Sequence, residues 1–563
     1  MKNIRPNFFK FASIPIVCVF FITVIISGCF KQETQAQNQE KQTQQKHIGY
    51  LRLPLKRAVK TIDPGKIFDI THVEVVEQLF LGLTDFEAKT YNVLPKLAKS
   101  WQVSKDGTVY TFQLRQEVKW INGEPVTAHD IVWAVQRNIA KETDSPYAHA
   151  LYILKNAEAI HHGGVAQLGV RAIDDYTVEF TLEQPASYFP ALASLPSYRP
   201  LPRKTIESYG KDWVLPKHIQ TNGPYMLTQW DKGKRFILKK NPHYYEADKV
   251  NIPEVHFYII PKNPLALAMY EKNDLDIIGG QIYLQVPPGE ISRIKSDITL
   301  RRERKIRPSF CTEWYGFNTL RPPMDNPLVR KAIAAAIDKK TLLNVAVKGE
   351  AVPAMTFLRS PYAEPDDVEP DNVEPKKDIG ILFNPKRAKA WLAKAGYPEG
   401  KGFPKVLLMH NSSKSHHEAA EAIKRILKYH LNIEIEVHEF DFMSYINKLR
   451  QSNKPHIFRM SWCADYPDAY HGLYELFHPN RGINWVGWRN REFSQVLAQA
   501  QRTSDPIERK KLYHRADQIL TAEEVAIVPL YFSNAQFMVK PWVKGWYSMA
   551  LGGQHICDWT LEN

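Results

Sequence analysis

Cysteine is the residue type with the most distinctive chemistry in this 563-residue sequence, which contains five of them. Two lie in an apolar N-terminal segment (Cys18 and Cys29), and three lie far downstream: Cys311, Cys463 and Cys557. Two of the downstream three could form a disulfide in an oxidising compartment, and the residues alone leave all three pairings open. No Cys-x-x-Cys, His-Glu-x-x-His or Gly-x-Ser-x-Gly segment occurs. We therefore expect no metal site, no cofactor and no hydrolase active site.

The N-terminal segment has the three parts of a secretory signal. Basic residues come first, an uncharged apolar run follows from Phe11 to Ile26, and the small residues Ser27 and Gly28 precede Cys29. The segment from Ile26 to Cys29 resembles the bacterial lipobox, which predicts removal of residues 1–28 and attachment of lipid to Cys29. An uncleaved transmembrane anchor is the alternative, because the apolar run is almost long enough to span a bilayer.

Composition bounds the rest of the chain. Residues 29–46 are rich in Gln, Glu and Thr, which predicts a flexible tether. The remaining residues are too many for one compact core, so two or three domains are expected. The formal net charge is +14, but Lys and Arg are spread along the chain without a clustered basic tract. This distribution indicates a solvated basic surface and no nucleic-acid partner.

Strand-like and helix-like stretches alternate from residue 48 onward. Alternating polar and apolar residues around the turn at Asp106-Gly107 predict a hairpin over 101–120. Thr127 can cap a helix over 128–140, and Asn326-Pro327 opens another through residue 337. This alternation predicts α/β lobes with partly parallel sheets. Further helices are expected over 385–395, 416–431 and 505–520, and strands over 406–409 and 433–437.

Longer motifs follow in order from about residue 62 to residue 542. They include Trp101-x4-Asp106-Gly107-x2-Tyr110-Thr111-Phe112-x-Leu114-Arg115, Thr221-Asn222-Gly223-Pro224-Tyr225, Arg330-Lys331-Ala332, Ser461-Trp462-Cys463-Ala464-Asp465-Tyr466 and Ile527-Val528-Pro529. Together these motifs resemble the periplasmic oligopeptide-binding proteins of ABC importers, in the peptide/nickel class of solute-binding protein family 5. The resemblance covers nearly the whole mature chain.

The resemblance implies an α/β fold that is periplasmic-binding-protein-like (class II, cluster C). Such a fold is a two-lobed flytrap with an additional third domain, and crossing strands connect the two lobes that close on the ligand. Lobe I would take 47–80, 205–310 and 532–563, the extra lobe II 81–204, and lobe III 311–531. The resemblance also implies a disulfide between Cys311 and Cys463, which leaves Cys557 as the odd thiol.

The resemblance further implies a receptor that is not an enzyme. It would capture short peptides between its lobes and deliver them to an inner-membrane ABC permease. With lipid on Cys29, it would be a monomer anchored to a membrane at the periplasmic side of the cell envelope. The same fold also serves receptors for haem, a lipid or another non-peptide solute, which is the main alternative. A structural or adhesive lipoprotein, by contrast, would show no stabilisation by any ligand.

A receptor for varied peptides must bind the groups that all peptides share, and their terminal charges need opposite charges when buried. The resemblance places Asp465 at the ligand ammonium and Arg459 at the carboxylate of one peptide length. His416 matches a histidine that serves another length, and its neighbour His417 could substitute. A turn or helix cap is the alternative role for Asp465, and a solvated helix start is the alternative for the two histidines.

The resemblance also places an extended peptide between two backbone segments, so that the peptide adds as a strand. One segment is Phe68-Asp69-Ile70 and the other is Ser461-Trp462-Cys463. Trp314 and Trp462 would form the walls of a side-chain pocket, with ordinary core packing as the alternative for either one.

Three positions depart from the family pattern. Phe68 and Gly316 stand where relatives carry acidic residues, and Val347 stands where relatives carry a lysine, with Lys348 one residue away. The glycine suggests a roomier or less polar pocket nearby. The two lost acidic groups favour a shift in ligand type, whereas Asp465 and Arg459 favour a peptide. The departure at Val347 argues against the full range of peptide lengths.

Overall fold

The structure, a computed structural model, describes residues 49–67, 69–346, 351–359, 380–464, 466, 468–479 and 483–562. The predictions for the signal segment, Cys29, the tether, Phe68, Val347 and Asp465 lie outside these residues. Among the helices of the described ranges, none is both long enough and apolar enough to cross a membrane.

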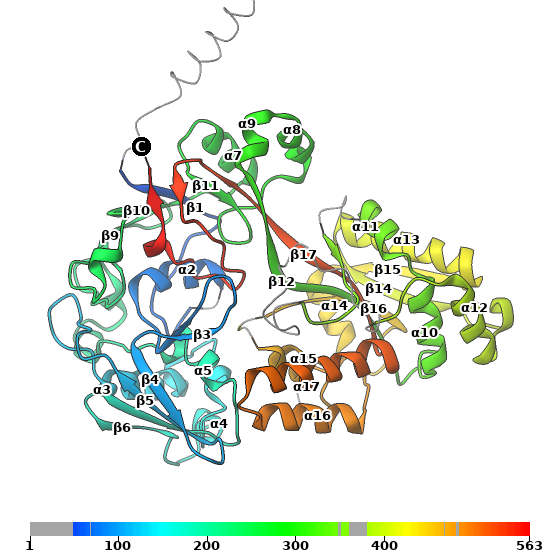
Figure 1. The fold of residues 1–563 in the computed structure, drawn as a ribbon, viewed down its shortest axis with the longest axis horizontal. Helices are drawn as coiled ribbons and strands as arrows, with labels where there is room; N and C mark the ends of the chain where they lie inside the picture. Colours follow the sequence, from blue (N-terminus) through cyan, green and yellow to red (C-terminus); the bar gives the residue numbers. More distant parts are fainter. Residues whose placement is uncertain are drawn as a thin grey trace, which may run out of the picture.

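One part of the molecule, here called lobe I, contains a four-stranded sheet in the order β1-β10-β9-β8 (Figure 1). β1 and β10 are parallel, and the other two pairs are antiparallel. Helix α2 packs beside β8 and buries Val75, Val76 and Leu79. The bounds are β1 (Leu51–Leu55), α2 (Ile70–Leu79), β8 (Tyr225–Asp231), β9 (Arg235–Lys240) and β10 (Glu254–Ile259).

A second part, lobe II, contains the antiparallel sheet β4-β5-β7-β6. The predicted hairpin is confirmed as β4 and β5, with Trp101 opposite Phe112. The predicted helix at 128–140 is confirmed as α3, where the backbone N–H of Thr127 donates to Asp130 at 2.9 Å. The bounds are β4 (Ala98–Val103), β5 (Val109–Leu114), α3 (Ala128–Ile139), α4 (Ala157–His161), β6 (Val170–Asp174), β7 (Thr177–Thr181) and α5 (Phe189–Leu192).

The third part, lobe III, contains most of a seven-stranded sheet in the order β11-β17-β12-β16-β14-β15, with β13 beside β17. β14 is parallel to both β15 and β16, as the alternation of strands and helices predicts. The bounds are β11 (Ile277–Gly279), β12 (Arg304–Phe317), β13 (Val352–Pro353), β14 (Val406–Asn411), β15 (Ile435–Phe440), β16 (Ile457–Cys463) and β17 (Ile527–Val539).

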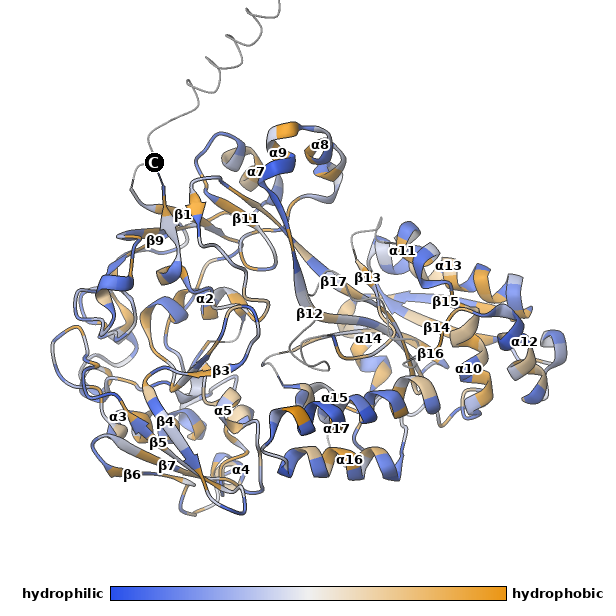
Figure 2. Ribbon diagram, viewed as in Figure 1, coloured by the Kyte–Doolittle hydropathy of each residue, from blue (hydrophilic) through white to orange (hydrophobic). Residues whose placement is uncertain are grey.

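Helices cover this sheet and extend one side of lobe III (Figure 1). Their apolar faces follow helical spacing, as in α16, where Phe493, Leu497 and Ala500 are buried while hydrophilic residues lie between them (Figure 2). The bounds are α10 (Pro327–Ala336), α11 (Lys339–Ala346), α12 (Pro385–Lys394), α13 (Lys414–Leu431), α14 (Phe442–Leu449), α15 (Ala469–Phe477), α16 (Arg491–Arg502) and α17 (Pro506–Gln518).

Two long strands, β12 and β17, connect lobe I to lobe III (Figure 1). At one end β17 pairs with β11 beside lobe I, and at the other end β12 pairs with β16 in lobe III. Their mutual register shifts between Pro308 and Thr312. A second shift lies between Glu313 and Trp314, so the pairing of the two connecting strands is irregular at two places.

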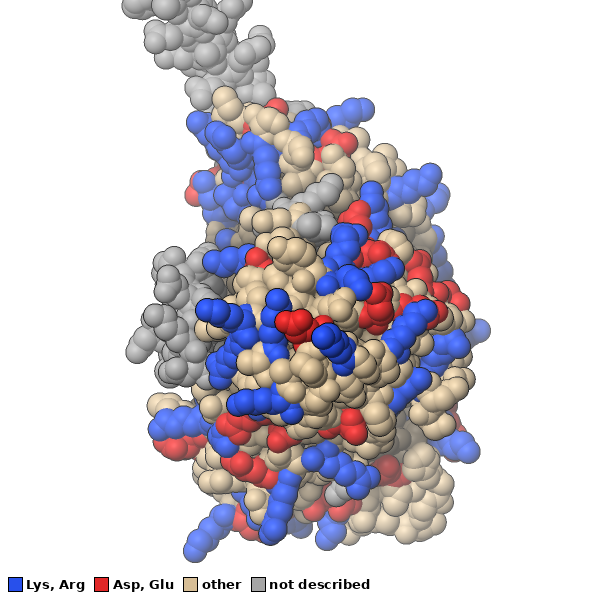
Figure 3. All heavy atoms as spheres, turned by 90° about the vertical axis from the view of Figure 1, so that its right-hand side faces the viewer, with Lys and Arg blue, Asp and Glu red and all other residues tan. Residues whose placement is uncertain are grey.

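Charge on the surface agrees with the sequence prediction on the face that Figure 3 shows. Lys and Arg side chains are interspersed with Asp and Glu on this face instead of forming one basic patch (Figure 3).

Candidate ligand-binding site

A cavity of about 240 Å³ lies where the three lobes meet. It brings together three of the predicted site residues: Asp69 and Ile70 from the start of α2, and Cys463 from the end of β16. The segment from Met549 to Gly553 also lines the cavity, as do several polar side chains that the sequence did not indicate. Those side chains are Glu77, Asp85, Arg199, Gln281 and His555.

Asp69 lies on the cavity wall as the N-cap of α2. Its carboxylate accepts hydrogen bonds from the backbone N–H groups of Thr71 and His72 at 3.0 and 3.1 Å, and lies 2.7 Å from the His72 ring. Burial opposes ionisation, but the interactions with His72 outweigh burial and hold the pKa of Asp69 below its usual value. The backbone is extended at Asp69, whereas Ile70 already belongs to the helix. Within 69–70, then, only Asp69 has the extended conformation that a strand partner needs.

β16 reaches the cavity with its last residue, Cys463, and has a partly free edge. Its antiparallel pairing with β12 runs from Ile457 to Cys463, whereas β14 pairs with it only at Ile457 and Phe458 within the described ranges. From Arg459 to Cys463 the second edge of β16 therefore has no strand partner among those residues. These five residues span about 13 Å. At the first of them, the Arg459 carbonyl already accepts a hydrogen bond from the Tyr445 hydroxyl.

The free edge presents backbone hydrogen-bonding groups. The N–H of Ala464 donates to the carbonyl of Phe310 at 3.1 Å, which makes that pair a hydrogen-bonded one. Because the two kinds of pair alternate along an antiparallel ladder, those at Ser461 and Cys463 are not hydrogen-bonded to β12. The Cα atoms of Cys463 and Cys311 are only 4.0 Å apart, as expected for such a pair. The N–H and C=O groups of Ser461 and Cys463 thus point to the free edge.

Arg459 is held in an ion pair within lobe III. Its guanidinium contacts the carboxylate of Glu313 and donates to the Asn411 side chain at 3.2 Å. Both members of the ion pair are largely buried. Burial raises the pKa of Glu313, and the charge of Arg459 opposes that rise. A ligand carboxylate at Arg459 must therefore compete with Glu313, which the sequence did not indicate because it lies on another strand.

The two predicted histidines take different places on the first turn of α13. The Nδ1–H of His416 donates to the carbonyl of Asn411 at 3.2 Å. Burial and the nearby charge of Arg459 lower the pKa of His416 to about 4, so its ring is neutral at pH 7. His417 instead lies 3.5 Å from Glu439. The structure thus gathers Arg459 and His416 around Asn411 and leaves His417 in a separate cluster.

Comparisons with known proteins agree with this architecture. Residues 92–484 match the model of the bacterial extracellular solute-binding proteins, family 5 (middle part). The oligopeptide-binding protein OppA of Bacillus subtilis is 30% identical over 94% of this chain and 96% of its own length. The chain belongs to family 5. This family consists of non-enzymatic, extracytoplasmic solute-binding proteins of ABC importers, so the predicted class and the absence of enzymatic activity are confirmed.

Relatives within the family differ in ligand and in conformation. The probable deoxycholate-binding periplasmic protein YgiS of Escherichia coli is 29% identical over 86% of this chain and 88% of its own. The unliganded open form of the murein tripeptide binding protein MppA superposes with a TM-score of 0.81, at 27% identity, over 92% of this chain and 98% of its own. Haemophilus influenzae OppA in complex with RPPGFSPFR gives 0.63, at 26% identity, over 91% and 99%. The predicted three-domain fold is confirmed.

The disulfide that the family resemblance implies is confirmed between Cys311 and Cys463, and Cys557 is the free thiol among the described cysteines. The disulfide joins β12 to β16 directly at the cavity, since both of its residues line the wall. It therefore fixes the register of the strand whose edge is free.

The two tryptophans lie in different surroundings. Trp462 lines a second, much smaller cavity beside Phe357 and Gly472. Trp314 is buried, with its ring in edge contact with Phe357, Phe458 and Phe477. Trp314 thus packs in the core of lobe III and does not line the inter-lobe cavity.

Gly316 was expected to leave a roomier or less polar pocket nearby; extra room at the residue itself is wrong, and its surroundings are apolar. A Cβ atom at Gly316 would lie 2.6 Å from the ring of Phe458 and 2.8 Å from the ring of Trp314. The space left by the missing side chain is filled by these aromatic rings. The absence at position 316 of the acidic side chain that relatives carry therefore changes the core of lobe III and does not open a pocket.

Cavity charges are largely paired inside the protein. Arg199 is buried and donates to Glu77 at 2.5 Å, and His555 lies 3.0 Å from Asp85. Burial opposes ionisation of Asp85, but the charge of His555 and the hydrogen bond to it lower the pKa of Asp85. These residues come from distant parts of the chain, so no local sequence pattern could have shown that they share one cavity.

Proposed function

We propose that this protein captures short peptides in the inter-lobe cavity and delivers them to an ABC permease. The observation that carries the proposal is the stretch of β16 from Arg459 to Cys463, which has no second strand partner among the described residues and ends with Cys463 on a cavity that Asp69 also lines. An extended peptide can donate and accept main-chain hydrogen bonds along such an edge whatever its side chains are. Peptide-binding relatives in the family support this choice of ligand.

Terminal charges of the peptide find partners at the two ends of the edge. We assign the ligand carboxylate to Arg459, with His416 as a neighbouring hydrogen-bonding group. We assign the ligand ammonium to Asp465, two residues beyond Cys463, because the acidic groups Asp69 and Asp85 on the cavity wall already have partners within the protein. The free edge then favours ligands of about three to five residues over longer peptides.

Cellular placement follows from the N-terminal segment. We propose that residues 1–28 are removed, and that lipid on Cys29 anchors the mature monomer at the periplasmic side of the cell envelope. Residues 29–46 would act as the tether that lets the receptor reach its permease.

The test combines ligand identification with one backbone variant. Mass spectrometry of natively purified protein should detect co-purified short peptides. Added tri- to pentapeptides should raise the melting temperature of the protein. At about 100 times Kd, ligand adds about 2.7 kcal/mol of stability. Ser461→Pro removes the N–H that faces the free edge without removing a hydrogen bond of the β12–β16 ladder.

We expect Ser461→Pro to weaken peptide binding at least tenfold, whereas Ser461→Ala, which keeps the N–H, should bind nearly as well as the parent. If both variants bind peptide equally tightly, the peptide does not add as a strand to β16. A co-purified haem, lipid or bile acid with no response to peptides would establish the alternative ligand class.

A further inference from the structure

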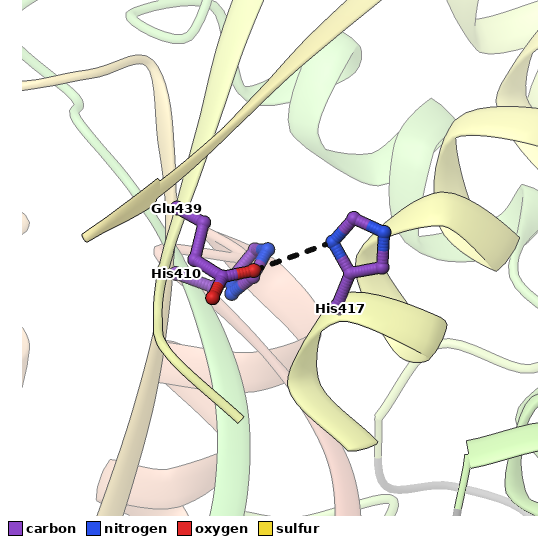
Figure 4. A group of neighbouring side chains, drawn as sticks. All are labelled: His410, His417 and Glu439. Atoms are coloured by element: carbon purple, nitrogen blue, oxygen red, sulfur yellow. Dashed lines mark ion pairs between the residues drawn. The ribbon is translucent and has the colours of Figure 1, made fainter. Parts of the chain in front are cut away.

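Two histidines and a glutamate converge at the carboxyl ends of two parallel strands (Figure 4). His410 on β14 and Glu439 on β15 are direct register partners. His417 comes from the first turn of α13, the helix that connects these two strands. One potential ligand atom from each of the three side chains lies within 4.8 Å of the others. The topology of this strand–helix–strand unit thus places three metal-ligating residue types together.

His410 has the features of a prepared ligand. Its side chain is fully buried, and its Nδ1–H donates to the carbonyl of Asn411 at 3.1 Å. That bond leaves the lone pair on Nε2, which is buried and has no hydrogen-bond partner among the described residues. A buried polar atom without a partner costs free energy. A backbone carbonyl holding the other ring nitrogen is the usual support of a metal-binding histidine.

The remaining two ligands leave the site accessible. His417 and Glu439 are about half exposed, with side-chain exposures of 54% and 44%, and their nearest ligand atoms are 3.5 Å apart. Two ligands of a tetrahedral zinc ion lie about 3.3 Å apart when the bonds are about 2.0 Å long. Small rotations of two surface side chains would therefore complete the coordination.

We propose that His410, His417 and Glu439 bind a divalent transition-metal ion of the zinc type. Imidazole nitrogen and carboxylate oxygen suit Zn²⁺, Ni²⁺ or Cu²⁺, whereas Mg²⁺ and Ca²⁺ prefer oxygen alone. Three protein ligands leave a fourth position open on the exposed side. This metal site could not be predicted from the sequence, because ligands at 410, 417 and 439 follow no standard spacing.

The metal site lies next to the proposed carboxylate site but does not depend on it. The Asn411 carbonyl accepts hydrogen bonds from both His410 and His416, and the Asn411 side chain accepts one from Arg459. Positive charge on Arg459 opposes a nearby cation, so we expect micromolar rather than nanomolar affinity. A bound ion would hold Asn411 in place and fix one end of the peptide edge.

Titration of Zn²⁺ into the metal-free, untagged full chain tests the proposal. Calorimetry should show one site, and Co²⁺ in its place should give visible absorption bands. His417→Ala and Glu439→Gln change half-exposed side chains, so folding is preserved, and each should weaken Zn²⁺ binding at least tenfold and abolish the Co²⁺ bands.

His438→Ala is the matched control, because His438 lies on the same strand and pairs with Glu436 at 2.6 Å outside the cluster. It should bind Zn²⁺ like the parent. The proposal is overturned if the parent binds no Zn²⁺, or if His417→Ala and Glu439→Gln bind as tightly as His438→Ala. Because no peptide is present, this outcome is independent of the peptide test.

Discussion

The ion pair between Arg459 and Glu313 occupies the place where a ligand carboxylate is expected. A largely buried guanidinium needs a negative partner, and Glu313 supplies it while no ligand is bound. A peptide carboxylate would take over part of this role. The internal pair thus lowers the affinity for any single carboxylate and keeps the arginine oriented.

Glu313→Gln tests this exchange. We expect the variant to lose about 3–5 kcal/mol of stability, because Arg459 is largely buried and loses its charged partner. Its preference for a free peptide carboxylate over a C-terminal amide should rise by about tenfold, which corresponds to about 1.4 kcal/mol. Arg459→Met, by contrast, should abolish the preference. Calorimetric titration with paired acid and amide peptides measures it, and an unchanged ratio in Glu313→Gln would argue against the exchange.

Glu74 gives the protein a pH-dependent stability. Its carboxylate is fully buried, contacts the Tyr283 hydroxyl, and accepts from the backbone N–H of Gln554 at 3.0 Å. Burial raises its pKa from 4.5 to about 7, although both hydrogen bonds oppose the rise. Between these two pH values the folded state binds more protons than the unfolded state. This contribution to stability is therefore complete at low pH and is lost as pH rises toward 7.

We expect the stability of the parent to fall by up to about 3 kcal/mol from this group between pH 4.5 and pH 8. Glu74→Gln, which cannot ionise, should show a flatter profile across the same window. Urea unfolding at several pH values measures the difference, and parallel profiles would show that Glu74 does not titrate in this range.

Some residue roles could be predicted from the sequence and others could not. The Cys311–Cys463 pairing followed from the family resemblance and is confirmed. The prediction of extra space at Gly316 was wrong. A glycine in the sequence shows that a side chain is missing, but it does not show which neighbouring side chains fill the space. The predicted roles of Asp465 at the ligand ammonium and of Phe68 as a strand partner stay predictions, because both residues lie outside the described ranges.

At the scale of elements, local signals predicted helix starts well. Asn326 accepts from the N–H of Leu328 at 2.9 Å, as a cap before a proline should. Strand bounds were less accurate. β15 begins at Ile435 and not at residue 433, because Asn432 adopts a left-handed conformation that ends α13. Two residues, 433 and 434, therefore lie between Asn432 and the first residue of β15.

The long strands β12 and β17 were not predicted residue by residue. Each contains a proline, Pro308 and Pro529, which normally argues against a strand interior. Tertiary pairing between the two strands overrides this local preference, with one register shift beside each proline. Only the family resemblance indicated crossing strands.

The disulfide makes an element-scale prediction. It closes a separation of 152 residues between β12 and β16. We expect the double variant Cys311→Ser with Cys463→Ser to lose about 2–5 kcal/mol of stability in urea unfolding. Cys557→Ser is the control, since that thiol is free. A double variant as stable as the control would mean that the strand pair holds its register unaided.

At the scale of the whole molecule, the chain superposes better on an unliganded open relative than on a peptide complex. We infer that the structure has the open arrangement of the lobes, and that the lobes rotate about β12 and β17 when ligand binds. The division into lobes at 81–204 and 311–531 stays a prediction in its boundaries. Contacts between lobes, such as the stacking of Tyr188 on Tyr470, could not be predicted because they join segments far apart in the chain.

Residue-resolved hydrogen exchange at β16 tests the central claim most directly. In the free protein the amides of Ser461 and Cys463 face the open edge, whereas the amide of Trp462 faces β12. A saturating tripeptide should slow exchange at Ser461 and Cys463 by at least tenfold and leave Trp462 nearly unchanged. If peptide binds while the exchange of Ser461 and Cys463 stays as fast as before, the ligand does not add to this strand.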